Sequence, residues 1–251
     1  MHNIGRTRSS QQPNHLLLTA DTFVRTILPG MKACSAVVHV SPALGAKFTE
    51  YTAEFEAGGE LGGTPAQRFI FVIEGGVKVE VNGKSGELSA RGYAFLPQGL
   101  RHRVVATKAS RVAVIEKRYQ ALDSVASPQL IISSEDAVSS HALADDPDDP
   151  SLQVKCLLPD EMSFDCAVNT MVYQPGASLS MVEMHVMEHG LIMLEGGGIY
   201  RLGDAWYPVT AGDFIWMAPW CPQWFGAIGK VPAKYLIYKD WNRHPLACLQ
   251  R

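Results

Sequence analysis

Glu183-Met-His185-Val-Met-Glu-His189 is the stretch of sequence that decides the fold expected for this chain. Its first glutamate and its two histidines stand at even separations, so on an extended strand their side chains share one face. Two imidazoles and a carboxylate on one face are donors of the kind that bind metal ions. Shortly afterwards, the run Leu194-Glu-Gly-Gly-Gly198 suits a tight turn between strands. The stretch therefore predicts a ligand-bearing strand that leads into a glycine turn.

A second pair of apolar runs follows the glycines and ends near an amide side chain. Residues 199–202 are Ile-Tyr-Arg-Leu, and residues 212–219 are Gly-Asp-Phe-Ile-Trp-Met-Ala-Pro. Both runs have the composition of short strands. Gln223 stands eleven residues after the glycine that opens the second run. We therefore expect a second strand pair that brings Gln223 close to the first three donors.

This order of residues resembles the cupin signature. In that signature a first motif carries two histidines and an acid ahead of a glycine, and a second motif runs from a glycine to a histidine that supplies the fourth ligand. Most cupins have His-x-His followed by Glu, whereas this chain has Glu-x-His followed by His, and Gln223 takes the place of the last histidine. Both exchanges are similar to the ligand set of the (S)-ureidoglycine aminohydrolases of purine and allantoin breakdown. The similarity extends over most of the chain, including residues 23–30 and 41–45.

The resemblance to ureidoglycine aminohydrolases implies a fold, an activity and a set of site residues. The implied fold is all-β, a bicupin with two jelly-roll β-barrel (cupin) domains in one chain. The implied activity is that of a manganese-dependent hydrolase, an aminohydrolase of linear amidine-type C–N bonds that releases ammonia from (S)-ureidoglycine and leaves (S)-ureidoglycolate. The implied metal ligands are Glu183, His185, His189 and Gln223. The implied catalytic residues are Glu183 and Lys239, and the implied substrate-binding residues are Glu183, Gln223, Tyr235, Lys239 and Tyr200.

The donor chemistry of the four ligands narrows the choice of metal. Imidazole nitrogen with carboxylate and amide oxygen, and no thiolate, favours a six-coordinate Mn²⁺ or Fe²⁺ site with open positions over a closed structural zinc site. We therefore expect Mn²⁺, with Fe²⁺ or Zn²⁺ as substitutes. Cys221 lies two residues before Gln223, on the same face of a strand, and leaves a softer metal open. A carboxylate held by a cation is a poor base, so Glu183 acts as a base only if it is loosely bound or shared.

Each of these side chains also has a purely structural interpretation. Two histidines and an acid can simply hydrogen-bond inside a barrel, and Gln223 can be a polar contact at the mouth of the barrel. Tyr235 and Lys239 are four residues apart and face one way on a strand, yet lysine is usually a surface residue. Tyr200 by itself suits a core position. An inward Lys239 beside a phenol would instead clamp a substrate carboxylate.

The pattern of short apolar runs and turn residues along the whole chain indicates two similar barrels. Short β-branched and aromatic runs alternate with glycine, proline and asparagine, which is typical of an all-β sandwich or barrel. Residues 73–97 align with the segment that begins at residue 194, at an offset of about 120 residues. A repeat of this size is a duplicated domain, because solenoid units are only about 20–50 residues long. We expect a flexible arm over residues 1–15, an N-terminal cupin barrel without metal over 16–120, a linker over 121–150 and a C-terminal cupin barrel with the metal site over 151–251.

The first copy lacks most of the metal donors of the second. Its matching positions include Ala-Gln-Arg at residues 66–68, and His102 alone stands near the position of the fourth ligand. Arg68 would repel a bound cation. We therefore expect the first barrel to keep the fold without a metal, as a packing and oligomerisation partner, and we expect His102 to lie in an exposed turn.

Composition argues against several classes of partner. The 251 residues, 47% hydrophobic and 19% charged, suit a protein that buries a sizeable core. A net charge of −3 and the lack of a Lys or Arg run argue against nucleic acid and membrane as partners. Five scattered cysteines without a Cys-x-x-Cys pair suit reduced thiols. With no signal-peptide core and no membrane span in the sequence, we expect a cytoplasmic homo-oligomer whose partner is a small-molecule ureide.

Two other classes of function stay open. An Fe(II) cupin dioxygenase can use similar mixed ligands, although a glutamine ligand argues against one. A cupin barrel can also be a non-catalytic small-molecule-binding protein, although the chain shows no helix-turn-helix pattern that would make it a DNA-binding sensor. Oxygen uptake during turnover separates a dioxygenase from a hydrolase, and ligand binding without turnover indicates a binding protein.

Overall fold

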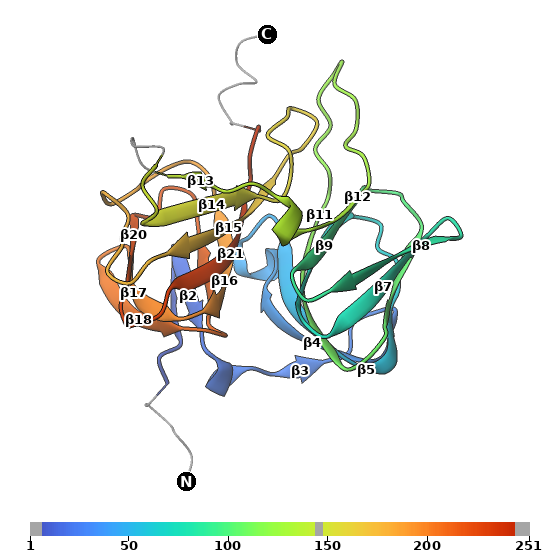
Figure 1. Ribbon diagram of the computed structural model, residues 1–251, viewed down its shortest axis with the longest axis horizontal. Coiled ribbons are helices and arrows are strands. Elements are labelled where there is room, and N and C mark those ends of the chain that lie inside the picture. Colours follow the sequence, from blue (N-terminus) through green and yellow to red (C-terminus); the bar gives the residue numbers. More distant parts are fainter. Residues whose placement is uncertain (1–6, 144–147, 244–251) are drawn as a thin grey trace. The chain divides into compact units, whose positions relative to one another are not determined.

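The computed structural model describes residues 7–143 and 148–243, and its regular structure is almost entirely β-strand (Figure 1). This confirms the all-β prediction. Within the described ranges, no helix has the length and hydropathy needed to cross a membrane. The chain divides into two compact units, Val24–Val138 and the combination of Met1–Phe23 with Ser139–Arg251.

The Val24–Val138 unit contains one ten-stranded antiparallel sheet. Its strands follow the order β12-β9-β6-β11-β5-β10-β7-β8, with β3 and β4 added beside β5. The strands are β3 (Arg25–Thr26), β4 (Met31–Val40), β5 (Thr49–Leu61), β6 (Gln67–Glu74), β7 (Gly76–Val81), β8 (Lys84–Ser89), β9 (Gly92–Leu96), β10 (His102–Ala106), β11 (Ser110–Lys117) and β12 (Ile131–Ser134). Two 3-10 turns, η2 (Pro42–Leu44) and η3 (Glu135–Ala137), complete the unit.

One long strand holds this first barrel together. The 13-residue strand β5 pairs with β4, β10 and β11, and its alternating side chains Tyr51 and Ala53 point into the core. Gly59 allows the backbone of β5 to approach β4, because a Cβ atom there would lie 2.2 Å from the carbonyl oxygen of Ala33. The core around these residues is formed by apolar side chains from most strands of the unit.

The second unit has two sheets that enclose a separate core. One sheet has the order β1-β2-β19-β16-β21-β15-β14-β13, and the other has the order β18-β17-β20. The strands are β1 (Ser10–Gln12), β2 (His15–Leu18), β13 (His141–Ala142), β14 (Leu152–Cys156), β15 (Ala167–Tyr173), β16 (His189–Glu195), β17 (Gly197–Leu202), β18 (Ala205–Thr210), β19 (Phe214–Met217), β20 (Gln223–Ala227) and β21 (Ala233–Lys239), and the 3-10 turn η1 (Ala20–Thr22) follows β2. Figure 1 shows β14, β15, β21 and β16 side by side in this unit.

The predicted glycine turn lies between β16 and β17. Gly196 has a φ of 63°, in the left-handed region that favours glycine. A Cβ atom on Gly196 would also lie 2.4 Å from the carbonyl oxygen of Pro232. The turn therefore requires glycine both for its backbone angle and for its close approach to the neighbouring chain.

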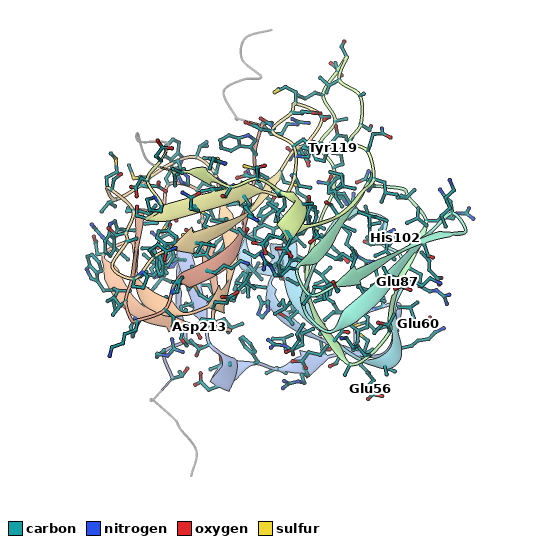
Figure 2. The ribbon with its side chains drawn as sticks, viewed as in Figure 1. Glu56, Glu60, Glu87, His102, Tyr119 and Asp213 are labelled. Carbon is teal, nitrogen blue, oxygen red and sulfur yellow. The ribbon has the colours of Figure 1, made fainter. Side chains whose placement is uncertain are left out.

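The predicted division into arm, barrel and linker differs from the structure at both ends of the first barrel. Strand β2 pairs with β19 of the second unit, and Leu17 is fully buried in that unit's core. The guanidinium of Arg8 also binds the carboxylate of Asp213, the residue that is labelled on this unit in Figure 2. Residues 7–18 therefore belong to the edge of the second barrel, where strand pairing and an ion pair hold them. Residues 1–6 lie outside the described residues. The prediction that the N-terminal barrel begins at residue 16 therefore differs from the structure, in which residues 16–18 belong to the second unit.

The predicted linker also contains strands. Residues 131–134 form β12, which pairs with β9, and residues 141–142 form β13, which pairs with β14. The boundary between the units falls between Val138 and Ser139. The connection without strands is therefore shorter than the predicted linker of residues 121–150. Part of the acidic run at the end of that linker lies outside the described residues.

Candidate metal centre and substrate cavity

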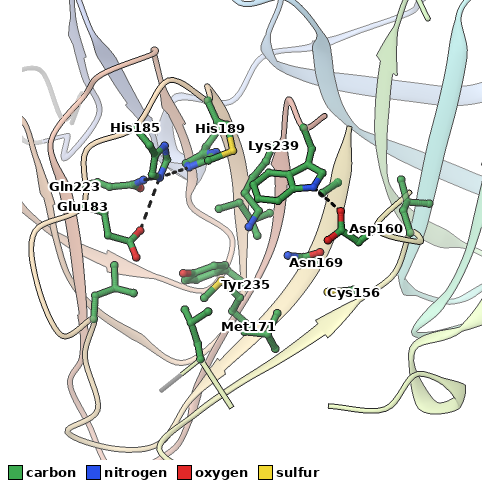
Figure 3. A pocket seen from close by; sticks show the side chains of 18 of the residues that line it. Cys156, Asp160, Asn169, Met171, Glu183, His185, His189, Gln223, Tyr235 and Lys239 are labelled. Atoms are coloured by element: carbon green, nitrogen blue, oxygen red, sulfur yellow. Dashed lines mark hydrogen bonds and ion pairs between the residues drawn. The ribbon is translucent and has the colours of Figure 1, made fainter. Parts of the chain in front are cut away.

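Backbone pairing brings Glu183 and Gln223 together. The N–H of Glu183 donates to the carbonyl of Gln223 at 2.8 Å, and the N–H of Gln223 donates to the carbonyl of Glu183 at 2.9 Å. Two residues that exchange both hydrogen bonds in an antiparallel pair place their side chains on the same side. The carboxylate and the amide consequently line the same cavity (Figure 3).

The segment before β16 is irregular, so the prediction that Glu183, His185 and His189 lie on one strand is wrong. Only His189 lies in a strand, where it opens β16. The segment follows β20 through two isolated bridges, Ser178 with Gly226 and Glu183 with Gln223. Between these two bridges the segment advances by five residues while β20 advances by three. The extra residues form a bulge that interrupts regular strand pairing.

The turn before β20 fixes the backbone of His185. The N–H of Trp220 donates to the carbonyl of His185 at 2.8 Å. Trp220 has a φ of 65°, a left-handed conformation that is unusual for a bulky residue and is common near functional sites. The side chain of Trp220 is 58% exposed, so its backbone, not its ring, contributes to the arrangement of the site.

Donor atoms from four side chains lie close together around His185 (Figure 3). The Nε2 atom of His189 lies 3.1 Å from the Nε2 atom of His185, and the Nε2 atom of Gln223 lies 2.9 Å from the same nitrogen. The nearest carboxylate oxygen of Glu183 lies 3.8 Å from it. The amide oxygen of Gln223 accepts a hydrogen bond from the Tyr200 hydroxyl at 3.3 Å, so the amide must turn over before its oxygen faces the imidazoles.

The cluster has the donors of a divalent cation site. Burial, with His185 and Lys239 nearby, lowers the pKa of His189 well below its ordinary value, so its imidazole is neutral, the form that binds metals. The Nδ1 atoms of both histidines are buried without a hydrogen-bond partner among the described residues. Two Nε2 atoms that face each other share at most one N–H···N bond, whereas a cation satisfies both lone pairs. In the described ranges, no three His, Cys, Asp or Glu side chains form a group that could hold a metal ion. The donor atoms of the cluster therefore do not have the geometry of a complete ligand set.

Cys221 does not belong to this cluster. Its thiol is buried and lies 3.6 Å from the carbonyl oxygen of Pro222, and it is not among the side chains that line the cavity. Burial raises the pKa of Cys221, which disfavours the thiolate that a soft metal needs. The alternative of a softer metal therefore has no support from the geometry.

A cation and two phenols line the same cavity as the cluster. Lys239 pairs with His189 across the β16–β21 ladder, and burial lowers the pKa of its ammonium. Burial raises the pKa of Tyr200 and of Tyr235 well above the ordinary value, so both keep their hydroxyl protons. The hydroxyl of Tyr235 also lies 2.7 Å from that of Tyr173. The cavity thus presents one positive charge and two hydroxyl groups toward a ligand.

The cavity has a volume of about 330 Å³ and lies wholly within the second unit. Its side chains form a polar end around the imidazoles and an apolar wall. The residues that line it include Glu183, His185, His189, Tyr200, Gln223, Tyr235 and Lys239, together with Val154, Cys156, Leu158, Asp160, Asn169, Met171, Ile237 and Trp241. The structure therefore gathers all seven residues that the sequence singled out, and their roles stay predictions.

Several polar residues of the cavity were not singled out by the sequence, among them Asn169, Asp160 and Trp241. Asn169 occupies an inward position of β15, where an amide interrupts an apolar alternation, and this interruption is a signal that the sequence does contain. Asp160 and Trp241 come from loops, and the indole N–H of Trp241 donates to Asp160 at 2.6 Å. The two residues are 81 positions apart, and no local pattern predicts that they meet.

Comparison with known proteins agrees with this architecture. Residues 169–238 match the Cupin domain family, and residues 43–119 match the EutQ-like cupin domain family. The prediction of a bicupin is confirmed. The crystal structure of a putative glyoxylate-induced protein from Pseudomonas aeruginosa superposes with a TM-score of 0.86 at 29% identity, covering 95% of this chain and 92% of that one.

Two plant proteins are similar over nearly the whole chain. The (S)-ureidoglycine aminohydrolase of Arabidopsis thaliana is 39% identical over 245 residues, which cover 96% of this chain and 80% of that protein. The chain belongs to the (S)-ureidoglycine aminohydrolase family. The probable (S)-ureidoglycine aminohydrolase of Oryza sativa subsp. japonica is also 39% identical, over 96% of this chain and 78% of that protein.

In this member of the ureidoglycine aminohydrolase family, the first barrel holds an ion-pair cluster at matching positions. Arg68 pairs with Glu116 across β6 and β11, as His189 pairs with Lys239 in the second barrel. The buried guanidinium of Arg68 lies 2.7 Å from the carboxylate of Glu116 and 2.8 Å from Nε2 of His102. His102 is buried, so the prediction of an exposed turn is wrong. A guanidinium at this place supports the prediction that the first barrel holds no metal.

Proposed function

We propose that this protein hydrolyses (S)-ureidoglycine to (S)-ureidoglycolate and ammonia at a Mn²⁺ ion in its C-terminal barrel. The observation that carries the proposal is the convergence of two imidazoles, a carboxylate and an amide beside the half-buried Lys239 in one small cavity. Membership of the family, whose relatives are named for this activity, supports the choice of substrate. A cavity of about 330 Å³ suits a substrate of this size.

Glu183, His185, His189 and Gln223 would hold the metal. When bound, such an ion offers open coordination positions and polarises the substrate groups and the water bound to it. The two imidazoles supply nitrogen donors, and Glu183 supplies the negative charge that favours a divalent cation. Gln223 contributes through its amide oxygen once the amide turns over.

Lys239 is suited to hold the substrate carboxylate. Desolvation of the ammonium in the cavity wall is costly, and the lowered pKa of Lys239 reflects this cost. A substrate carboxylate offsets the cost, and the hydroxyls of Tyr235 and Tyr200 donate hydrogen bonds beside it. These contacts orient the α-carbon of the substrate toward the imidazole cluster.

The reaction exchanges a C–N bond for a C–O bond at that carbon. Water supplies the oxygen, and one of its protons leaves with the amine as ammonia. Glu183 is suited to carry this proton, because its side chain lines the cavity, is 38% exposed and lies beside the cluster. The other carboxylate of the cavity, Asp160, already accepts a hydrogen bond from Trp241.

An assay on freshly prepared (S)-ureidoglycine tests the proposal. The purified protein should release ammonia with Mn²⁺ present, should lose this activity on treatment with a chelator, and should consume no oxygen. Glu183→Gln is the matched variant, because it keeps the shape of the side chain and removes its charge. Oxygen uptake in step with turnover would indicate a dioxygenase, and ligand binding without any product would indicate a binding protein; either outcome would contradict the proposal.

A further inference from the structure

Asn169 is a polar side chain of the cavity to which the proposed reaction gives no role. It lies on β15 between Cys156 of β14 and Ile237 of β21, and it lines the cavity (Figure 3). The residue is only 6% exposed. Its Oδ1 atom is buried and has no hydrogen-bond partner among the described residues. An unpaired amide in such a wall is unfavourable, and a ligand that pairs with it removes that cost.

The surroundings of Asn169 set its amide apart from the other polar groups. The next inward positions of β15 are Met171 and Tyr173, so the amide interrupts an apolar wall. Lys239 provides the charge for a carboxylate, and Asp160 is engaged by the indole of Trp241. Asn169 therefore remains available for a neutral group that offers both a donor and an acceptor.

A carbamoyl group, H₂N–C=O, matches a primary amide atom for atom. One N–H of the carbamoyl nitrogen lies on the same side as its own carbonyl, so the two planar groups can form two parallel hydrogen bonds. The Oδ1 atom accepts from the carbamoyl N–H, and the Nδ2 atom donates to the carbamoyl oxygen. A secondary amide in its trans form holds N–H and C=O on opposite sides and cannot pair twice in this way.

We propose that Asn169 is a specificity-determining residue that recognises the carbamoyl end of a ureido substrate. This assignment rests on the proposed function, because it places the carboxylate on Lys239 and the ureido group at the other end of the same molecule. It goes further in naming the group that separates a ureido acid from other small carboxylates. A site built to pair with an N–H discriminates strongly against an analogue that lacks it.

Two small ligands separate this role from general packing. N-carbamoylglycine and N-acetylglycine share a carboxylate, a CH₂ and an amide, and differ in having NH₂ or CH₃ at the far end. The full chain loaded with Mn²⁺ should bind N-carbamoylglycine about tenfold more tightly than N-acetylglycine, as measured by calorimetry, which corresponds to about 1.4 kcal/mol. Asn169→Leu, similar in shape but without the amide, should bind the two ligands equally.

Two further variants keep the test interpretable. Asn169→Ala should also lose the preference, so a folding failure of Asn169→Leu does not decide the result. Val172→Thr changes the opposite face of the same strand and should keep the tenfold preference. Preference retained in the folded Asn169 variants, or equal or undetectable binding of the two ligands by the unchanged protein, would overturn the assignment.

Ammonia release from (S)-ureidoglycine, measured on the same preparations, separates this assignment from the proposed function. A protein that prefers N-carbamoylglycine through Asn169 but releases no ammonia keeps the carbamoyl subsite and loses the proposed activity. A protein that releases ammonia equally well with Asn169→Leu, at unchanged KM, keeps the activity and loses the subsite.

Discussion

The Nε2 atom of Gln223 lies 2.9 Å from the Nε2 atom of His185, although 38 residues separate them in the chain. The contact depends on the reciprocal backbone hydrogen bonds between Glu183 and Gln223, which align the irregular segment with β20. The position of Gln223 is therefore set by the pairing of the barrel backbone.

Gln223→His tests whether the amide does more than hold the metal. An imidazole is a stronger donor than an amide, so the variant should retain the metal. It should lose most of its turnover of (S)-ureidoglycine if the amide also orients the substrate. Metal content and kcat measured on one preparation check both statements, and an unchanged kcat would show that the identity of this side chain is irrelevant to the chemistry.

Lys239→Met removes the proposed carboxylate partner and keeps the length of the side chain. The variant should bind the metal normally, while kcat/KM falls by an amount equivalent to about 2–5 kcal/mol, the range for truncating one partner of a buried charge pair. It should also unfold at a higher denaturant concentration, because the methionine side chain removes the desolvation cost that lowers the pKa of the Lys239 ammonium. Lys230→Met, at an exposed position, is the control. Wild-type kcat/KM in Lys239→Met would refute the role.

Arg68→Met tests the independence of the first barrel. The variant leaves the carboxylate of Glu116 without its buried partner and should destabilise the protein by about 3 kcal/mol in chemical denaturation. The metal content should not change, because the donors lie in the other unit. His102→Ala should likewise retain the metal. A loss of metal from either folded variant would place a metal site in the first barrel.

Glu50 makes the stability of the first barrel depend on pH. It lies buried on β5, and neither carboxylate oxygen has a hydrogen-bond partner in the described part of the chain. Burial raises its pKa well above its ordinary value of 4.5. The folded state therefore keeps a proton that the unfolded state releases, so this group lowers the free energy of unfolding as pH rises above about 4.5.

Glu50→Gln removes this titration. The variant should be more stable than the parent protein at pH 8, and the difference should shrink toward pH 5. Urea denaturation at the two pH values measures it. A difference that does not depend on pH would mean that Glu50 titrates normally in the folded protein.

The fold and most of the site were predictable because their signals are local. Gly196 marks a turn that only glycine forms, and Gln223 is found by counting from Gly212 once the strand order is assumed. Tyr235 and Lys239 both line the cavity because β21 alternates regularly.

What the sequence did not predict depends on contacts between distant segments. Glu183 and His185 have the spacing of strand residues, but Glu183 pairs with β20 only through an isolated bridge, and His185 lies in the irregular segment before β16. The run at residues 16–18 has the composition of a strand, yet its pairing with β19 is set by an open sheet edge that is far away in sequence. Asp160 meets Trp241 for the same kind of reason.

The most direct test of the account is the metal content and ammonia release of His189→Ala beside the unchanged protein. The unchanged protein should carry one Mn²⁺ per chain and release ammonia from (S)-ureidoglycine. His189→Ala should remain folded by circular dichroism, carry no metal and release no ammonia. A folded His189→Ala protein that still carried one metal ion per chain would contradict the placement of the centre in the C-terminal barrel.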